Sequence, residues 1–266
     1  DKAVYVSKSG RPGPVLLDIP MDIQRAEIDP DKLESFVSEE ETINTEEIDN
    51  DLEQIFELIE KSKRPLVLFG AGVKLAKAEA EAEEFIEKSG LPFTMSWAAV
   101  DLFGHDHPLF SGTFGVSATR YGNFTVQNAD FLLVIGSRLD TRQTGGRPEN
   151  FAPHAKKVFV DIEPAEMHKK RGLEPDLAVI SDAKNFLTKI NKKIEKIKKP
   201  EIAAWLLQIK VWKEKYPICL PEYKEQKEKV NIYYFMKVLS EESNPTDVVI
   251  TDAGGNLTWT MQGFVV

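Results

Sequence analysis

The chain has 266 residues, of which 42% are hydrophobic and 29% charged, and its formal net charge is −9 at pH 7. Such an acidic chain repels a phosphate backbone on average, which argues against a nucleic-acid partner. Its longest apolar runs fall well short of the about 20 residues that a membrane-spanning helix needs, so we expect no membrane partner. Cys219 is the only cysteine, which excludes an intrachain disulfide and favours the reducing cytoplasm.

The first 47 residues show little periodic pattern. Residues 1–24 begin with a short helix and continue into Val15–Leu17, an apolar run between prolines that predicts one short strand. Residues 25–47 are acidic and lack a steady period, which is typical of a linker on a surface. Thr45 gives a start signal for a helix with apolar residues at helical spacing.

From residue 64 to residue 197, apolar strands alternate with amphipathic helices. The expected strands are residues 64–72, 91–97, 130–140, 156–164 and 175–183, and the expected helices are residues 76–90, 117–129 and 183–197. Strands alternating with helices of this length predict repeated βαβ units. We therefore expect an α/β fold built on a doubly wound parallel sheet.

Residues 191–230 break this rhythm. They are rich in Lys and Glu, with Trp205 and Trp212 one heptad apart, which favours a surface helix whose aromatic face packs on the body over a membrane or calmodulin-target helix. "NIYYFMKVLSEES" predicts one more helix. The apolar run Val248–Ile250 then predicts a buried strand that delivers the turn Gly254–Gly255–Asn256 to a ligand.

Two strand ends carry residues that are typical of phosphate binding. Gly70–Ala71–Gly72 follows a strand and opens a helix, where glycine lets a diphosphate approach backbone N–H groups. Arg138, Asp140 and Arg142 alternate after another strand, and two guanidiniums there suit a phosphate or the edge of a flavin ring. The alternative is a solvated loop with an internal Arg–Asp pair.

Two aspartates and two histidines leave alternatives open. Asp161 ends a strand, where it would hold ribose hydroxyls or cap a helix that starts near Pro164. Asp182 repeats the pattern as a cap or an adenine-side contact. His105 and His107 lie in "FGHDHPLF" without a third ligand, so we expect a surface loop and assign no metal ligand.

Three stretches together carry a resemblance: "SGRPGPVLLDIPMDIQ", "FGVSATRYGNFTVQNADFLLVIGSRLDTRQTGGRPENFAPHAKKVFVDIEPAEMHKK" and "VVITDAGGNLTWTMQGF". They resemble the catalytic subunit of acetohydroxyacid synthase (acetolactate synthase), a thiamine-diphosphate-dependent transferase of branched-chain amino acid biosynthesis. The resemblance implies decarboxylation and carboligation of 2-oxo acids such as pyruvate. It further implies thiamine diphosphate and Mg²⁺, possible FAD, and a homodimer or homotetramer at full length.

The resemblance also implies a division of the chain among three domains. The expected parts are residues 1–24 as the C-terminal end of a pyrimidine-binding domain, 25–47 as a linker, 48–190 as a central Rossmann-like domain, 191–229 as a helical linker and 230–266 as the start of a diphosphate-binding domain. On this view the chain is a middle slice without the family's activating glutamate and magnesium-binding segment. We therefore assign it no catalytic residue and expect no activity from it alone.

Match to the family's motifs implies a set of cofactor contacts. The residues expected to bind FAD are Arg11, Gly70, Ala71, Gly72, Ser96, Trp97, Gly115, Val116, Gly136, Arg138, Asp140, Arg142, Asp161, Ile162, Asp182 and Ala183. Gly254, Gly255 and Asn256 stand in place of the family's diphosphate-contacting turn, where Gly-Gln-His is usual. Trp97 stands where members often have Leu, so its ring would stack on a ligand ring or fill that ring's place.

Two alternatives remain beside the acetolactate synthase interpretation. One is another thiamine-diphosphate decarboxylase of the superfamily, with a different acyl donor and no FAD. The other is a non-catalytic module for nucleotide binding or subunit interaction.

Overall fold

The structure is a computed structural model that describes residues 1–38, 48–167, 169, 172–244 and 246–265. The chain divides into two compact units, residues 1–44 and 45–266. The predicted helix start at Thr45 and the end of the predicted linker lie outside the described residues. No helix among the described residues is both long enough and apolar enough to cross a membrane.

The first unit consists of short helices joined by irregular chain. Its helices are α1 (Lys2–Lys8), α2 (Met21–Gln24) and the single 3-10 turn η1 (Pro30–Lys32). The strand predicted at Val15–Leu17 is wrong, because these residues form no strand and Leu16 is 91% exposed. An apolar run becomes a strand only where a neighbour pairs its backbone groups, and none of the described strands pairs with this one.

The second unit is built on one sheet of six parallel strands. The strands are β1 (Pro65–Phe69), β2 (Phe93–Met95), β3 (Phe110–Thr113), β4 (Phe131–Ile135), β5 (Lys156–Asp161) and β6 (Leu177–Ile180). Their order is β3-β2-β1-β4-β5-β6, with every pairing parallel. This is the doubly wound order, which confirms the predicted fold class.

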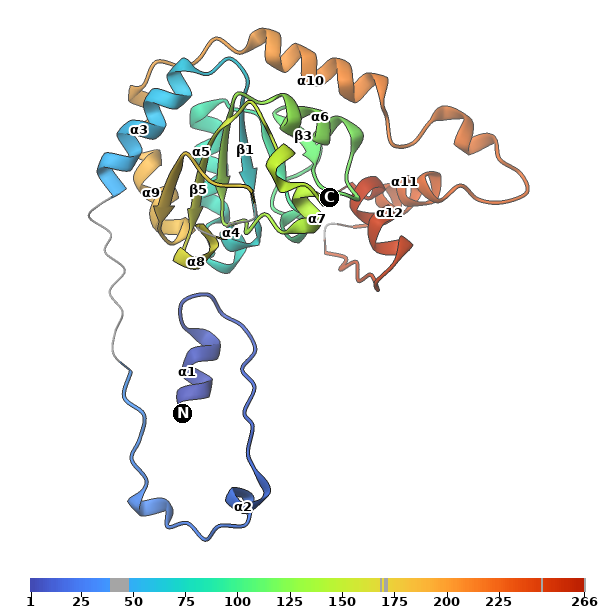
Figure 1. The fold of residues 1–266 in the computed structure, drawn as a ribbon. Helices are drawn as coiled ribbons and strands as arrows, with labels where there is room; N and C mark the ends of the chain where they lie inside the picture. Colours follow the sequence, from blue (N-terminus) through green and yellow to red (C-terminus); the bar gives the residue numbers. More distant parts are fainter. Residues whose placement is uncertain (39–47, 168, 170–171, 245, 266) are drawn as a thin grey trace. The chain divides into compact units, whose positions relative to one another are not determined.

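Helices cover both faces of this sheet (Figure 1). The residues of β1 alternate between the two faces. Val67 and Phe69 pack with α3 (Ile48–Lys61), α5 (Glu79–Ser89) and α9 (Ala183–Asn191). Leu66 and Leu68 pack with α6 (Arg120–Asn128) and the segment after β4. The helices are α3 (Ile48–Lys61), α4 (Ala71–Leu75), α5 (Glu79–Ser89), η2 (Trp97–Ala99), α6 (Arg120–Asn128), α7 (Thr141–Thr144), η3 (Pro148–Asn150), α8 (Pro164–Met167), α9 (Ala183–Asn191), η4 (Ile194–Lys196), α10 (Ala203–Lys215), η5 (Pro221–Glu225), α11 (Ile232–Glu242) and α12 (Gly255–Gly263). Continuous apolar strands are stable here because helices bury both of their sides.

The edge strand β3 is not foreseen from the sequence. It reads Phe-Ser-Gly-Thr, and all four residues are buried. The Ser111 hydroxyl donates to the carbonyl of Phe93 (2.8 Å), and the Thr94 hydroxyl donates to that of Gly112 (2.6 Å). Backbone carbonyls of the paired strands thus satisfy the buried hydroxyls, which lets a polar sequence occupy the sheet.

The tryptophans of α10 attach this helix to the body, as predicted. Trp205 is buried, and its indole N–H donates to the carbonyl of Pro65 at the start of β1 (3.0 Å). The ring of Trp212 lies 5.7 Å from that of Trp205 and 5.8 Å from that of Phe124 in α6. The aromatic face of α10 therefore packs on α6 and on the start of β1.

The strand predicted at Val248–Ile250 is wrong. Its residues form no strand, and Val248 and Ile250 are 82% and 89% exposed, because no described strand pairs with them. The predicted turn is present and leads directly into a helix. Gly254 has φ +110° and caps α12, whose residue Met261 is buried.

The turns after β1 and β4 touch each other backbone to backbone. The N–H of Gly70 donates to the carbonyl of Ile135, and the N–H of Gly72 donates to that of Gly136, both at 2.9 Å. A Cβ on Gly72 would lie 2.6 Å from the Cα of Gly136, and one on Gly70 would lie 2.2 Å from the Gly136 carbonyl oxygen. Close packing of the two turns therefore requires these glycines, whatever ligand lies nearby.

The loop between β2 and β3 holds both histidines of the His-Asp-His motif. The ring of His105 stacks on Phe110 (4.9 Å between centroids), and its Nε2 donates to the carbonyl of Val100 (2.8 Å). His107 Nδ1 accepts the N–H of Leu109 (3.1 Å). Both rings are partly buried, whereas Gly104, Asp106 and Pro108 beside them are exposed, so the motif lies in a surface loop, as expected, and its histidines pack against the body.

Gly72→Ala is expected to lower the free energy of unfolding by about 2–3 kcal/mol, because the added methyl meets the backbone of Gly136. The direction of this stability change tests the backbone contact, since alanine inside a helix is ordinarily favoured over glycine by up to about 1 kcal/mol. Gly146→Ala is the matched control: nothing lies within 4 Å of its Cβ position, so we expect a change under about 0.5 kcal/mol. Urea unfolding compares the two variants, and equal stabilities would contradict the contact.

Burial holds the pKa of His105 below its ordinary value, against the opposing effects of its bond to Val100 and of Asp106. The unfolded chain therefore binds more protons in the window below about pH 6.5. The stability that depends on neutral His105 is expected to be complete above that value and to be lost as the pH falls through the window.

His105→Gln tests this dependence, because it keeps an N–H donor but does not titrate. Its free energy of unfolding should decline less than that of the wild type between about pH 7.5 and about pH 5.5. Chemical unfolding at the two pH values measures the difference. Identical declines would show that His105 does not carry the effect.

Candidate functional site

A cavity lies at the carboxyl edge of the sheet, where the chain brings together loops that are distant in sequence. It encloses about 400 Å³ and is lined by Trp97, the loop after β3, α7 and the start of α12. Its volume is within the range of small-molecule sites, and most of its wall is apolar. The members of the predicted cofactor set that meet here are Trp97, Gly115, Val116, Arg142 and Gly254. We call it the apolar cavity.

One wall of the apolar cavity is fixed by backbone contacts. The N–H of Val116 donates to the carbonyl of Arg142 (2.8 Å), which joins the loop after β3 to α7. Gly115 has φ +120°, and a Cβ there would lie 2.9 Å from the same carbonyl oxygen. The side chain of Asn123 bonds both the N–H and the carbonyl of Gly115 at 2.9 Å. Glycine is therefore the residue that fits this wall.

Trp97 and Arg142 form a cation–π pair at the cavity. The guanidinium carbon of Arg142 lies 5.3 Å from the centre of the Trp97 ring. Phe114, Leu257 and Met261 add apolar surface to the same lining. A flat aromatic ligand with negative charge suits this combination, because the rings offer stacking surface and the guanidinium offers a permanent positive charge.

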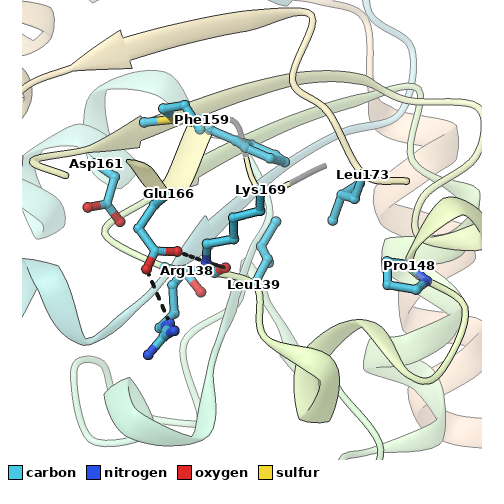
Figure 2. A pocket seen from close by; sticks show the side chains of 10 residues that line it. Arg138, Leu139, Pro148, Phe159, Asp161, Glu166, Lys169 and Leu173 are labelled. Carbon is cyan, nitrogen blue, oxygen red and sulfur yellow. Dashed lines mark hydrogen bonds and ion pairs between the residues drawn. The ribbon is translucent and has the colours of Figure 1, made fainter. Parts of the chain in front are cut away.

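A second cluster lies where β4 and β5 end, around Arg138 (Figure 2). Arg138 Nε lies 3.5 Å from Oε1 of Glu166 in α8, and the ammonium of Lys169 contacts the other oxygen of that carboxylate. Lys169 Nζ also donates to the backbone carbonyl of Arg138 (2.9 Å). Asp161 borders the same cavity, which encloses only about 20 Å³. The charged side chains thus nearly fill this space themselves.

The alternative of an internal Arg138–Asp140 pair is wrong. Asp140 Oδ1 accepts the N–H groups of Arg142 (2.8 Å) and Gln143 (3.2 Å) and so caps α7. The partner that the structure gives to the Arg138 guanidinium is Glu166.

The other two aspartates of the cofactor set also bind backbone N–H groups. Asp161 Oδ1 accepts the N–H of Glu163 (3.0 Å), just before α8. Asp182 Oδ1 accepts the N–H groups of Lys184 (2.9 Å) and Asn185 (3.2 Å) and caps α9. Each of these bonds uses Oδ1, so they do not consume Oδ2 of either carboxylate. The local role therefore leaves Oδ2 of each carboxylate for the ligand contact that the resemblance implies.

Donors in the turn after β1 are directed inward. The N–H groups of Gly70 and Gly72 bond the carbonyls of Ile135 and Gly136, so these two donors do not face a ligand in this conformation.

Ser96, directly after β2, differs from these glycines because its polar group is not satisfied by any described residue. Its hydroxyl is buried and has no hydrogen-bond partner among the described residues, which fits a polar ligand atom at that point.

The structure does not bring the whole predicted set together. Arg11 belongs to the first unit, and the other predicted residues belong to the second. Gly255 and Asn256 are exposed in the first turn of α12, where a Cβ on Gly255 would lie 2.7 Å from the Trp259 ring. Ile162 and Ala183 follow the ends of β5 and β6 and border neither cavity. Among the described residues, no three His, Cys, Asp or Glu side chains are placed to hold a metal ion.

Sequence patterns do not reveal several residues of the site. Glu166 and Lys169 occur in "PAEMHKK", which predicts only the start of a helix. Phe114 and Leu257 are isolated apolar residues outside any strand pattern. Their place in the site depends on chain folding that brings distant loops together, and no local signal encodes it.

Comparison with known proteins decides the family. The profile described as "Thiamine pyrophosphate enzyme, central domain" matches residues 52–190, just over half of the chain. The chain belongs to the thiamine pyrophosphate enzyme family. The matched residues contain all six strands of the sheet, so the doubly wound unit is the central domain of this family.

Relatives of this thiamine pyrophosphate enzyme chain extend the similarity beyond the central domain. The chain is 31% identical to the acetolactate synthase large subunit of Cyanidium caldarium, over 98% of this chain and 45% of the relative. It is 32% identical to acetolactate synthase 2, chloroplastic, of Nicotiana tabacum, over 98% and 39%. It is 31% identical to the acetolactate synthase isozyme 2 large subunit of Escherichia coli (strain K12), over 98% and 45%. The chain thus spans less than half the length of these relatives.

Proposed function

We propose that this chain provides the central domain of a thiamine-diphosphate-dependent enzyme that decarboxylates and ligates 2-oxo acids such as pyruvate. The observation that carries the proposal is the apolar cavity, in which loops of the central domain meet Gly254, well beyond residue 190. The similarity to acetolactate synthases over 98% of the chain supports the reaction class.

We further propose that FAD lies along the carboxyl edge of the sheet. The predicted contacts include Asp161, the last residue of β5, and Gly115, after β3. These two strands are four inter-strand steps apart, roughly 19 Å, a span suited to a dinucleotide rather than a single phosphate. The flavin ring would occupy the apolar cavity beside Trp97, Arg138 would meet the diphosphate, and Asp161 Oδ2 would accept adenosine hydroxyls. The buried hydroxyl of Ser96 gives this path a polar group that lacks a described partner.

The residues of this chain would bind and orient in the reaction, and we assign none of them a proton-transfer role. Thiamine diphosphate, when bound, supplies the electron sink that decarboxylation of a 2-oxo acid requires. Gly254 and the start of α12 would cover one side of the cavity and exclude water from it. We assign no Mg²⁺ ligand to the described residues.

Two observations favour a second candidate, a family member without FAD. The Trp97 ring already stacks with Arg142 at the apolar cavity, and the N–H donors of Gly70 and Gly72 are bonded inside the fold. Such a cavity would serve as a packed boundary of the central domain rather than as a flavin site. Flavin titration separates the two candidates.

Arg138→Ala is expected to weaken FAD binding about tenfold to hundredfold, because one charge-assisted contact is lost. Arg138→Lys should recover only part of the affinity, since an ammonium cannot make a forked contact with a diphosphate. Arg147→Ala is the control, because this exposed arginine lies outside both cavities. Quenching of flavin fluorescence measures all four proteins. Equal affinities throughout would remove Arg138 from the site, and no binding to the wild type would remove FAD.

The reaction itself is tested on the complete gene product that contains these residues. It is expected to form acetolactate from pyruvate, and the rate should fall to the blank when thiamine diphosphate or Mg²⁺ is omitted. The 266 residues expressed alone are expected to give no product, since they span at most 45% of the relatives above. A colorimetric acetolactate assay follows both proteins. Turnover by the 266 residues alone would contradict the assignment to a central domain.

A further inference from the structure

Arg138 is contacted by Glu166 and Lys169, two residues that do not border the proposed ligand. The carboxylate of Glu166 lies between two cations, the ammonium of Lys169 and the guanidinium of Arg138 (Figure 2). Lys169 also bonds the backbone carbonyl of Arg138 (2.9 Å). The same pair therefore holds Arg138 by its backbone and by its side chain. We call this pair the Glu166–Lys169 clamp.

The clamp residues are much more buried than Arg138, the residue that they hold. The side chains of Glu166 and Lys169 are 11% and 17% exposed, whereas that of Arg138 is 50% exposed. The cavity beside them has room for about one water molecule, so a diphosphate cannot enter the clamp. A ligand can meet Arg138 only from its exposed side. Glu166 approaches the guanidinium at Nε, which leaves the forked terminal nitrogens as the natural phosphate donors.

We propose that Glu166 and Lys169 are positioning residues that orient Arg138 toward the diphosphate of a dinucleotide. This inference rests on the proposed flavin site. A free arginine loses rotamer entropy when a ligand orders it, which weakens binding. The clamp orders Arg138 before the ligand arrives. The affinity of the chain for the ligand therefore rises, although neither clamp residue touches the ligand.

The test must separate orientation from charge. Removing the Glu166 charge alone would raise the local net charge by one unit near the phosphates, and this added attraction would mask a loss of orientation. The double variant Glu166→Gln with Lys169→Met removes one charge of each sign, so the local net charge is unchanged. It is expected to bind FAD about 2- to 12-fold more weakly than the wild type, the effect of ordering one long side chain.

The same two substitutions in an Arg138→Ala background are the decisive comparison. They are expected to leave FAD affinity unchanged there, because the residue through which they act is gone. A purely structural role would produce the same loss in both backgrounds and would overturn the proposal. Affinity equal to or above that of the wild type in the double variant would also overturn it.

Two further measurements keep the outcome unambiguous. Thermal unfolding establishes that each variant is folded. If the double variant is not folded, Glu166→Asp replaces it. This change keeps the charge but draws the carboxylate away from Nε, so it should weaken FAD binding only when Arg138 is present.

If the wild type binds no FAD, the proposed flavin site is refuted and the clamp with it. If the wild type binds FAD and the variants match it, only the clamp is refuted.

Discussion

The backbone bond between the Gly72 N–H and the Gly136 carbonyl is the constraint on which the carboxyl edge of the sheet depends. In a doubly wound sheet, β1 and β4 are the neighbours at which the strand order reverses, and ligands bind outside their carboxyl ends. Here the two turns meet at that point, and no side chain fits between them. Space for a ligand therefore lies on the two sides of the contact, at the Arg138 cluster and at the apolar cavity.

The segment from Gly136 to Gln143 connects these two sides. Ser137 borders the small cavity, and its hydroxyl bonds the side-chain carbonyl of Gln143 in the wall of the apolar cavity (2.9 Å). Arg138 and Arg142 stand four residues apart and reach opposite sides, and Asp140 between them caps α7, the short helix that contains Arg142. One loop thus presents two permanent positive charges in a chain of net charge −9, which concentrates attraction for an anionic ligand at this edge.

The sequence predicted the strands that are buried on both sides, because continuous apolar runs bounded by Gly and Pro have few other uses in an α/β chain. The prediction failed for segments in which pairing with a neighbouring strand decides whether a strand forms. Phe110–Thr113 is polar and was missed, yet it pairs with β2, which satisfies its hydroxyls. Val15–Leu17 and Val248–Ile250 are as apolar as true strands, but no described strand pairs with them. Strand formation depends on non-local pairing, which a single run of residues does not encode.

The same limit applies to the site. Alternating charges after a strand located Arg138 and Arg142, but their partners Glu166 and Trp97 come from other loops and required the fold. The nature of the Arg138 partner supports a role in orientation. A mostly buried carboxylate between two cations loses much hydration, and apolar residues of similar size often stabilise a fold as well or better. What an apolar residue cannot supply is a fixed direction for a guanidinium, and we infer that this direction is the reason for a charged group at Glu166.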